Sequence, residues 1–278
     1  MSPEILLAAP VMLPLLGAAV ALLTRHRAGL QLIVTIGTLS VNLVIAALLM
    51  YWISENSILV LQIGKWTPTL GIVLVADRLT GLMLLVSSFV TLAVLIYASA
   101  QTISEHIEST PIAIFHPSYL LLVAGVSNAF LAGDLFNMYV GFEILLAASF
   151  VLLTLGGSAS RVRAATTYVI VSMVSSMLFL VGIASCYAAV GTVNLAEIAA
   201  RMDHVDHHVR LLIEFVLLIA FGLKAAIFPL SAWLPDSYPT APAPVTAVFA
   251  GLLTKVGIYA IIRLETLMFP ESEISTVL

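Results

Sequence analysis

Three charged residues lie in the middle of long apolar stretches of this sequence. Glu143 stands in Gly-Phe-Glu-Ile-Leu-Leu, Lys224 in Phe-Gly-Leu-Lys-Ala-Ala and Lys255 in Leu-Thr-Lys-Val-Gly. A charge at the centre of a membrane helix costs about 2.5–3.5 kcal/mol, so such residues usually serve transport or proton transfer. A carboxyl group and two amines that exchange protons would form a proton relay. This is the chemistry that these residue types predict.

A static Glu–Lys ion pair that holds two helices together is the structural alternative. It accounts for Glu143 and one lysine but leaves the second lysine unexplained, so the relay is preferred. Two amines at one depth repel and are poorly solvated, whereas a carboxylate favours the charged amine. These opposing effects predict protonation that can switch, which arginine could not provide because it stays charged.

Pro229 predicts a break in the helix that carries Lys224. It removes the hydrogen bond to the carbonyl of Ala225, and its ring clashes there. Broken helices at membrane depth line cavities or polar paths, and an ordinary proline kink is the alternative. Counted from a turn at residues 235–242, Lys224 and Lys255 lie about 15 and about 18 Å from one membrane face. Both lysines are therefore expected near the midplane.

Three further residues are candidates for an accessory role. Asp134 precedes the helix of Glu143, where capping of that helix is the preferred interpretation. Glu214 lies early in the helix of Lys224 and would help a proton reach the outer surface. Tyr259 follows Lys255 by one turn on the same face and is a candidate hydrogen-bond partner for it, with interfacial or core packing as the alternative.

Other polar and aromatic residues have simpler explanations. Asp77 and Arg78 are expected to form a pair at the membrane interface. The histidine-rich stretch 203–208 is predicted to be a solvated loop, and no metal site is expected. Trp66 and Trp233 lie near the ends of predicted spans and are interpreted as interface anchors.

The elements that must position these groups are transmembrane helices. The chain has 278 residues, of which 61% are hydrophobic and 9% charged, with a mean hydropathy of +1.13; soluble domains carry about a quarter charged residues. Apolar runs such as 82–96 lack the alternation of a β-barrel. We therefore predict an all-α integral membrane protein with about eight transmembrane helices and a proline-broken seventh helix. The expected spans are roughly 5–24, 29–53, 78–100, 117–133, 135–155, 163–190, 209–234 and 243–263.

Residues 1–278 are expected to form one polytopic membrane domain without a soluble part. The early cations Arg25 and Arg27 follow the first apolar run, so that run is interpreted as a retained helix rather than a signal peptide. These two residues, with Arg161 and Arg163, lie in short loops on one side. The positive-inside rule then places the N-terminus outside the cytoplasm.

Several classes of function are disfavoured. The net charge of −4 does not predict a nucleic-acid partner, and the single Cys186 excludes a disulfide framework or a cysteine metal site. The sequence has no phosphate-binding or dinucleotide glycine motif and no paired haem histidines, so no cofactor is predicted. Energy is expected from an ion gradient or from partner subunits.

Three segments resemble a known family of membrane subunits. Residues 222–246, which read GLKAAIFPLSAWLPDSYPTAPAPVT, are similar to the antiporter-like subunits of respiratory complex I, membrane-bound hydrogenases and Mrp-type cation/proton antiporters. Residues 247–263 (AVFAGLLTKVGIYAIIR) and 133–143 (GDLFNMYVGFE) resemble the D subunit of the Mrp type in particular.

The resemblance implies a mechanism and a domain plan. Glu143, Lys224 and Lys255 match the family's fifth-, seventh- and eighth-helix ionisable residues, which pass protons along a chain at mid-membrane depth. Residues 1–100 would be three N-terminal helices and 117–263 the first five-helix repeat, with the second, inverted repeat absent from the chain.

The expected function is that of a proton-translocating subunit of a multisubunit Na⁺/H⁺ antiporter in the bacterial cell (inner) membrane. Its partners would be other antiporter subunits, the lipid bilayer, protons and Na⁺ or another monovalent cation. It would be a secondary transporter component and not an enzyme. Two alternatives remain: a proton-pumping subunit of a complex I-type oxidoreductase or a membrane-bound hydrogenase, and a truncated scaffold that does not transport.

Overall fold

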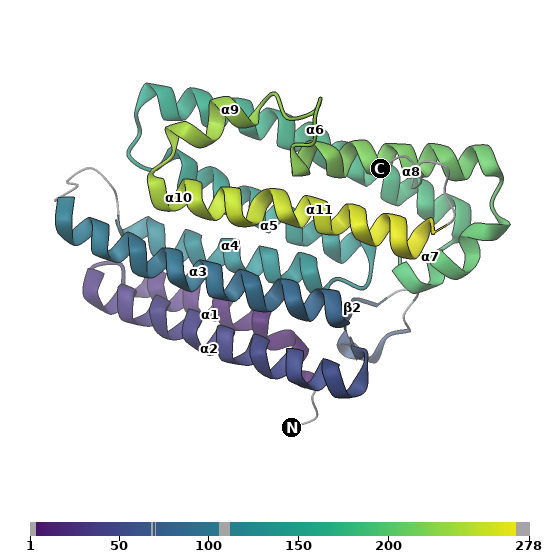
Figure 1. Cartoon of the computed structure of the whole chain (residues 1–278), viewed down its shortest axis with the longest axis horizontal. Coiled ribbons are helices and arrows are strands. Elements are labelled where there is room, and N and C mark those ends of the chain that lie inside the picture. The colour runs from purple at the N-terminus through teal and green to yellow at the C-terminus, as the bar shows by residue number, and fades with distance from the viewer. Residues whose placement is uncertain (1–3, 68, 70, 106–111, 271–278) are drawn as a thin grey trace.

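The structure is a computed structural model that describes residues 4–67, 69, 71–105 and 112–270. Its helices lie side by side in layers, as Figure 1 shows. The short helix Ile5–Ala8 leads into α1 (Ala9–Leu23), which packs with α2 (Ala28–Asn56), and α2 packs in turn with α3 (Arg78–Glu105). The next layer contains α4 (Ile112–Leu131) and α5 (Leu135–Thr154), and the far layer contains α6 (Ala159–Val190) and α8 (His207–Ala225). The short helix α7 (Leu195–Arg201) connects α6 to α8.

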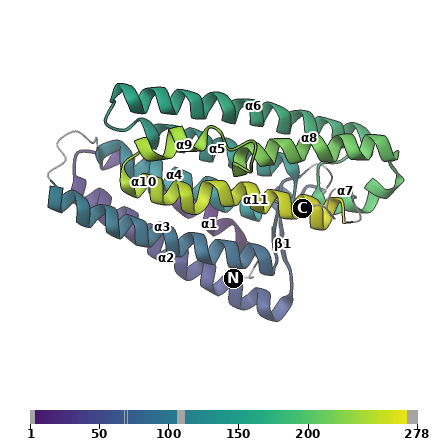
Figure 2. The same cartoon turned by 45° about the horizontal axis from the view of Figure 1, so that its top comes forward.

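The last helical stretch is assembled from several short elements. After α9 (Leu234–Ser237) come α10 (Ala243–Val248), the π-helical segment Phe249–Leu253, α11 (Thr254–Arg263) and a second π-helical segment, Leu264–Met268. Figures 1 and 2 both show this stretch between α3 and α8. The π-helix is rare and is found most often near functional sites.

Seven helical stretches of the described residues are long and apolar enough to cross a membrane: Ile5–Leu23, Ala28–Glu55, Arg78–Ala100, Ala113–Leu131, Leu135–Thr154, Ala159–Val190 and Ala243–Met268. The helix α8 makes the eighth, with 19 residues and three charged side chains. The predicted all-α membrane fold of about eight helices is therefore confirmed. The segment between α2 and α3 contains a small hairpin, in which β1 (Leu59–Gln62) pairs antiparallel with β2 (Val73–Ala76).

Several predicted boundaries were wrong by a few residues. The fourth span begins at Ile112 instead of residue 117, and the sixth begins at Ala159, where Ser158 caps it through the amide of Arg161. The eighth stretch continues to Met268 because the π-helical segment extends it. These errors leave the order of the spans unchanged.

The predicted break in the seventh span is confirmed, but it lies earlier than Pro229. Helix α8 ends at Ala225, and Ala226 adopts a left-handed conformation with φ of 53°. Residues 226–233 form turns, and the indole nitrogen of Trp233 donates to the carbonyl of Leu223 at 3.0 Å. This bond satisfies one of the carbonyl groups that the end of a helix leaves free.

The early end of α8 changes two expectations from the sequence. The depth of Lys224 was counted along a continuous helix to residue 234, which α8 does not form. Trp233 was expected at the membrane interface, but the turns carry it back into the bundle, where it is 5% exposed. Trp66 has an exposed side chain, as the anchor interpretation requires.

Two close approaches between helices hold the layers in place. A Cβ atom added to Gly257 in α11 would lie 2.6 Å from the backbone nitrogen of Ala225 at the end of α8. A Cβ atom on Gly141 in α5 would lie 2.8 Å from the nitrogen of Ala129 in α4. Small residues at such contacts are typical of packed membrane helices, since apolar area alone does not drive their association.

A polar network joins α11 to α3 and α4. Arg263 donates from Nη1 to Asp77 Oδ2 at 2.7 Å and from Nε to the Tyr259 hydroxyl at 2.9 Å. The Tyr259 hydroxyl donates to the carbonyl of Phe130 at 2.7 Å and lies 2.9 Å from the hydroxyl of Thr80. Asp77 therefore pairs with Arg263 across the bundle. The expected pair of Asp77 with its neighbour Arg78 is not formed.

We predict that the Asp77–Arg263 ion pair contributes about 2 kcal/mol to stability. Burial raises the pKa of Asp77, but hydrogen bonds from Arg263 and Thr80 and the charge of Arg263 bring it down from 3.8 to about 2. The folded pKa is the lower one, so the stabilisation is present above 3.8 and is lost as the pH falls toward 2. Asp77→Asn should show this loss at neutral pH by chemical denaturation in detergent.

Asp203→Asn is the matched control, because Asp203 pairs with Arg210 at 3.2 Å but its side chain is 75% exposed. Exposed ion pairs contribute about 0–1 kcal/mol. Equal losses for the two variants would contradict the assignment of Asp77 as a structural anchor of α11.

Candidate functional site

A line of hydrogen bonds joins Glu143 to Lys224 across three helices. The Ser176 hydroxyl of α6 donates to Glu143 Oε1 of α5 at 2.5 Å. The amine of Lys224, in the last turn of α8, donates to Ser176 Oγ at 3.0 Å. The structure thus brings together two of the three groups singled out in the sequence, with a serine between them.

The surroundings of this line are largely aromatic. The Lys224 amine lies 5.2 Å from the centre of the Phe142 ring, a cation–π geometry. The rings of Phe142, Phe179 and Phe221 pack on one another, with Phe179 and Phe221 4.7 Å apart. Charge interactions are stronger in such a medium than in water. The break after Ala225 also places Lys224 at the negative end of the helix dipole, which favours a cation.

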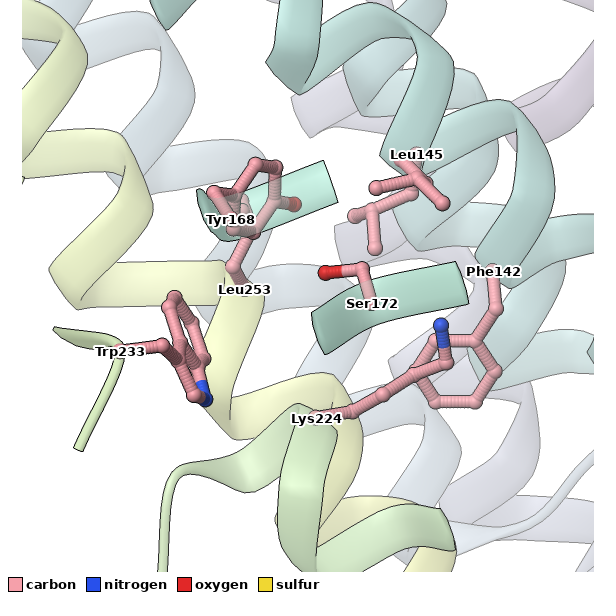
Figure 3. Close-up of a pocket in the computed structure, with 8 residues that line it drawn as sticks. Phe142, Leu145, Tyr168, Ser172, Lys224, Trp233 and Leu253 are labelled. Carbon is pink, nitrogen blue, oxygen red and sulfur yellow. The ribbon is translucent and has the colours of Figure 1, made fainter. Parts of the chain in front are cut away.

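A cavity of about 20 Å³ adjoins Lys224. Figure 3 shows the Ser172 hydroxyl between the Lys224 amine and Tyr168, with Trp233 at the opposite wall. This volume is sufficient for one water molecule, which needs polar partners of the kind that line it. The lining also includes Leu253, which ends the π-helical segment just before α11.

The cavity continues the polar line toward α5. The hydroxyl groups of Tyr168 and Ser149 lie 2.7 Å apart, and Ser172 is also within hydrogen-bonding reach of Tyr168. Hydroxyl groups, which can both donate and accept, therefore lie on both sides of the Lys224 amine: Ser176 toward Glu143, and Ser172, Tyr168 and Ser149 beyond the cavity. Such a sequence of groups can conduct protons.

Lys255 has no hydrogen bond to Glu143, Ser176 or Lys224 in this structure. It is exposed, and its amine donates to the carbonyl of Ala250 at 2.7 Å and to the Thr254 hydroxyl at 3.3 Å. The expectation that all three ionisable groups are buried together was therefore wrong for Lys255. Gly257 faces α8, and a residue two positions away points about 200° around the helix from it.

The accessory candidates have separate outcomes. The capping role of Asp134 is confirmed, since its side chain accepts from the amide of Asn137 at 2.6 Å. It also accepts from the amide of Val73 at 3.3 Å. Burial raises the pKa of Asp134 although these backbone hydrogen bonds act against the rise. Its place is at the junction of α4, α5 and the β-hairpin, away from Lys224.

The other two accessory residues also lie apart from the line. The hydrogen bond expected between Tyr259 and Lys255 is not formed, because the Tyr259 hydroxyl is engaged by Phe130, Thr80 and Arg263. Glu214 is fully buried about 15 Å along α8 from Lys224. Among the described residues there is no group of three or more metal-ligating side chains, and this covers the stretch 203–208.

Sequence reasoning missed the polar residues of α6. Tyr168, Ser172 and Ser176 recur every four residues and so lie on one face of that helix. This four-residue spacing of polar side chains in an apolar span can be read from the sequence alone. It indicates that one face of the helix packs against polar groups, but it does not identify those groups.

Comparisons with known proteins agree on one family. Residues 132–278 match the family described as NADH:quinone oxidoreductase/Mrp antiporter, TM. The D subunit of the Na(+)/H(+) antiporter of Alkalihalophilus pseudofirmus is 40% identical over 94% of this chain and 52% of its own length. The D subunit of the probable K(+)/H(+) antiporter of Rhizobium meliloti is 46% identical over 76% of this chain and 38% of its own length.

Solved structures show the same fold. A chain of the Mrp complex from Dietzia sp. DQ12-45-1b has a TM-score of 0.88 and 33% identity, covering 97% of this chain and 50% of that one. A chain of the membrane-bound sulfane sulfur reductase, an archaeal respiratory complex, has a TM-score of 0.89 and 26% identity, covering 98% and 55%. The chain spans about half the length of the curated relatives that it matches. The resemblance to D subunits seen in the sequence is thereby confirmed.

We predict that Glu143 and Lys224 are energetically coupled through Ser176. Glu143→Gln and Lys224→Met should each destabilise the fold, since each leaves a buried charge without its partner. The double variant should lose about 1–3 kcal/mol less than the sum of the two. Chemical denaturation in detergent measures this cycle.

Ser175→Ala is the matched control for Ser176→Ala. Ser175 donates to the carbonyl of Ala220 in α8 at 2.7 Å, so its loss removes one buried bond between the same helices. Only Ser176→Ala should reduce the coupling between Glu143 and Lys224. Additive single-variant losses would show that the two groups do not interact.

Proposed function

The chain belongs to the NADH:quinone oxidoreductase/Mrp antiporter transmembrane family, and from this premise we propose that it translocates protons as the D-type component of a multisubunit monovalent cation/proton antiporter. The hydrogen-bonded line Glu143–Ser176–Lys224 at the broken end of α8 is the observation that carries the proposal. Its place is the cell membrane of a bacterium, and its partners are the other antiporter subunits.

The line supplies an elementary step of proton transfer. In the charged state, Lys224 carries three amine protons and donates one toward Ser176, while Ser176 donates its own proton toward the carboxylate of Glu143. When Ser176 passes its proton to Glu143 and receives one from Lys224, both end groups become neutral. The reverse transfer restores the ion pair. Net movement then requires only that protons enter at one end and leave at the other.

The cavity beside Lys224 is the proposed continuation of this path. A water molecule in it would connect the Lys224 amine with the hydroxyls of Ser172 and Tyr168. From Tyr168 the polar line reaches Ser149. A hop along these groups needs only small rotations of hydroxyls, because each can donate and accept.

Lys255 has a different part in the proposal. Its charged group is exposed on a membrane-spanning stretch, where contact with lipid would be costly. We therefore propose that another part of the assembled antiporter covers this face, and that Lys255 passes protons to that covering protein. The carbonyl of Ala250, within the π-helical segment Phe249–Leu253, accepts from the Lys255 amine and holds it in a defined direction.

The exchanged cation is proposed only as a monovalent one. The relatives are named for Na⁺ in one organism and for K⁺ in another. The proposed energy source is the gradient of protons against that cation, so the chain would act as a secondary transporter component.

A redox-driven proton pump is the second candidate. The similarity to a chain of an archaeal respiratory complex, the sulfane sulfur reductase, favours it. Its identity of 26% is lower than the 40% shared with an antiporter D subunit. The relay would be the same, but electron transfer in partner subunits would drive it.

We predict that transport depends on Lys224 and Ser176 but not on Ser175. Lys224→Met should abolish cation-dependent proton movement, and Ser176→Ala should slow it by about 100-fold or more, within the range that a positioned proton-transfer group contributes. Ser175→Ala should stay close to wild type. The measurement is cation/proton antiport in everted membrane vesicles that contain the complete set of partner subunits.

Assembly of each variant with its partners is checked in the same membranes by purification through a partner subunit. Normal antiport by an assembled Lys224→Met variant would reject the relay and favour the scaffold role. Proton movement that follows an electron donor, and not an added cation, would favour the redox-driven candidate.

A further inference from the structure

A second pair of acidic side chains lies apart from the Glu143 site. Glu214 in α8 is fully buried (0% exposed), and neither oxygen of its carboxyl group has a hydrogen-bond partner among the described residues. Glu265, in the π-helical segment Leu264–Met268, likewise has two buried carboxyl oxygens without a partner. Buried polar atoms are nearly always hydrogen-bonded, so four unpartnered oxygens in one region require an explanation.

The two carboxyl groups act on each other. Helix α8 packs against the segment Leu264–Met268, and the charge of Glu214 is felt at Glu265. The segment is the second π-helical stretch of the chain, a conformation that is rare and is often found at functional sites. The pair therefore occupies one apolar region between two helices.

The described charged groups of the packed elements are already engaged elsewhere. The arginines are Arg210 of α8, Arg201 of α7 and Arg263 of α11, and their carboxylate partners are Asp203, Glu197 and Asp77 respectively. The lysines are Lys224 of α8, which donates to Ser176, and Lys255 of α11, which donates to the carbonyl of Ala250. The guanidinium of Arg210 also lies over the ring of Phe269, 5.8 Å from its centre. The second half of α6 adds the buried thiol of Cys186 and the exposed phenol of Tyr187, neither of which is a cation at neutral pH.

Two ionised carboxylates in this setting would be strongly unfavourable. An isolated buried charge is costly, and a second like charge beside it adds repulsion. A protonated carboxyl group removes its own charge and becomes a hydrogen-bond donor, which a neighbouring carboxylate can accept from. Protonation of one carboxyl group therefore removes one buried charge and supplies a hydrogen-bond donor for the unpartnered oxygens.

We propose that Glu214 and Glu265 form a second proton-binding site, which holds at least one proton at neutral pH. The site lies about 15 Å along α8 from Lys224, on the side of α7. It would serve as a proton store between that end of the bundle and the Glu143–Lys224 line. The role of the site as a proton store rests on the proposed function. The binding of a proton by Glu214 and Glu265 does not.

Infrared spectroscopy of the complete purified assembly tests the occupancy. At neutral pH the wild type should show the carbonyl stretch of a buried protonated carboxyl group, which shifts in deuterium oxide. Glu265→Gln should remove or shift this band, because glutamine keeps the shape of the acid but has no carboxyl proton. If the carbonyl band of the protonated carboxyl group were unchanged in both Glu265→Gln and Glu214→Gln, the proposal would be overturned.

Glu197→Gln is the matched control from the neighbouring helix α7. Glu197 accepts a hydrogen bond from Thr69 at 3.0 Å and pairs with Arg201. Hydrogen bonds from Thr192 and Thr69 and the charge of Arg201 lower the pKa of Glu197. It is therefore ionised at neutral pH, and its replacement should leave the band in place.

The dependence of stability on pH gives an independent measurement. A pair that is protonated when folded and ionised when unfolded stabilises the fold at low pH, and this stabilisation is lost as the pH rises. The thermal midpoint of the wild type should fall as the pH rises above the ordinary glutamate pKa of about 4.3, and the fall should continue until the folded pair loses its proton. Glu214→Gln/Glu265→Gln should remove part of that fall, and a fall of the same size in this double variant would count against the site.

A bound cation is the competing way to neutralise the pair. If Na⁺ in place of choline raises the midpoint of the wild type but not that of Glu265→Gln, a cation occupies the site and the proton-binding proposal is wrong. None of these measurements uses antiport, so failure of the proton site and failure of the proposed function are separate results.

Discussion

An ionised group inside an apolar helical bundle needs a partner, and the hydroxyl of Ser176 serves two such groups at once. It donates to the carboxylate of Glu143 and accepts from the amine of Lys224. A direct ion pair would hold the two charges in one fixed state. The intervening hydroxyl keeps them linked while providing a proton that can move in either direction. The relative positions of α5, α6 and α8 therefore matter, and the close approaches of Gly141 to α4 and of Gly257 to the end of α8 help to fix α5 and α8 within the bundle.

Departures from regular helix geometry coincide with the ionisable groups. Helix α8 ends one residue after Lys224, and π-helical segments precede Lys255 and contain Glu265. A regular helix uses nearly all of its backbone groups internally and can offer little to a buried charge. A helix end leaves carbonyl groups free, and in the π-helical segment Phe249–Leu253 the carbonyl of Ala250 accepts a bond from the Lys255 amine. Irregular backbone within a membrane is tolerated where protein or a polar cavity surrounds it.

The need of a buried acidic group for a partner is met differently at each acidic residue of the bundle. Asp77 meets a guanidinium and becomes a structural anchor, and Asp134 meets backbone amides and becomes a helix cap. Glu143 meets a hydroxyl that leads to an amine, which suits proton exchange. Glu214 and Glu265 are buried without a hydrogen-bond partner among the described residues, and this is the basis for proposing that they hold a proton. Residue type alone would not have separated these roles.

The sequence by itself determined the membrane class, the approximate spans and the break near Lys224, and it singled out Glu143 and Lys224 as candidate proton carriers. These follow from hydropathy, from the chemistry of proline and from the cost of charge in lipid, all of which act locally along the chain. Only the tertiary structure decided that Ser176 bridges the two groups, that Lys255 faces outward and that Tyr259 and Asp77 bind Arg263. A position along a helix sets the depth of a residue, but its neighbours depend on how that helix is rotated and on what packs against it. Contacts between residues as distant in sequence as Asp77 and Arg263 are properties of that packing.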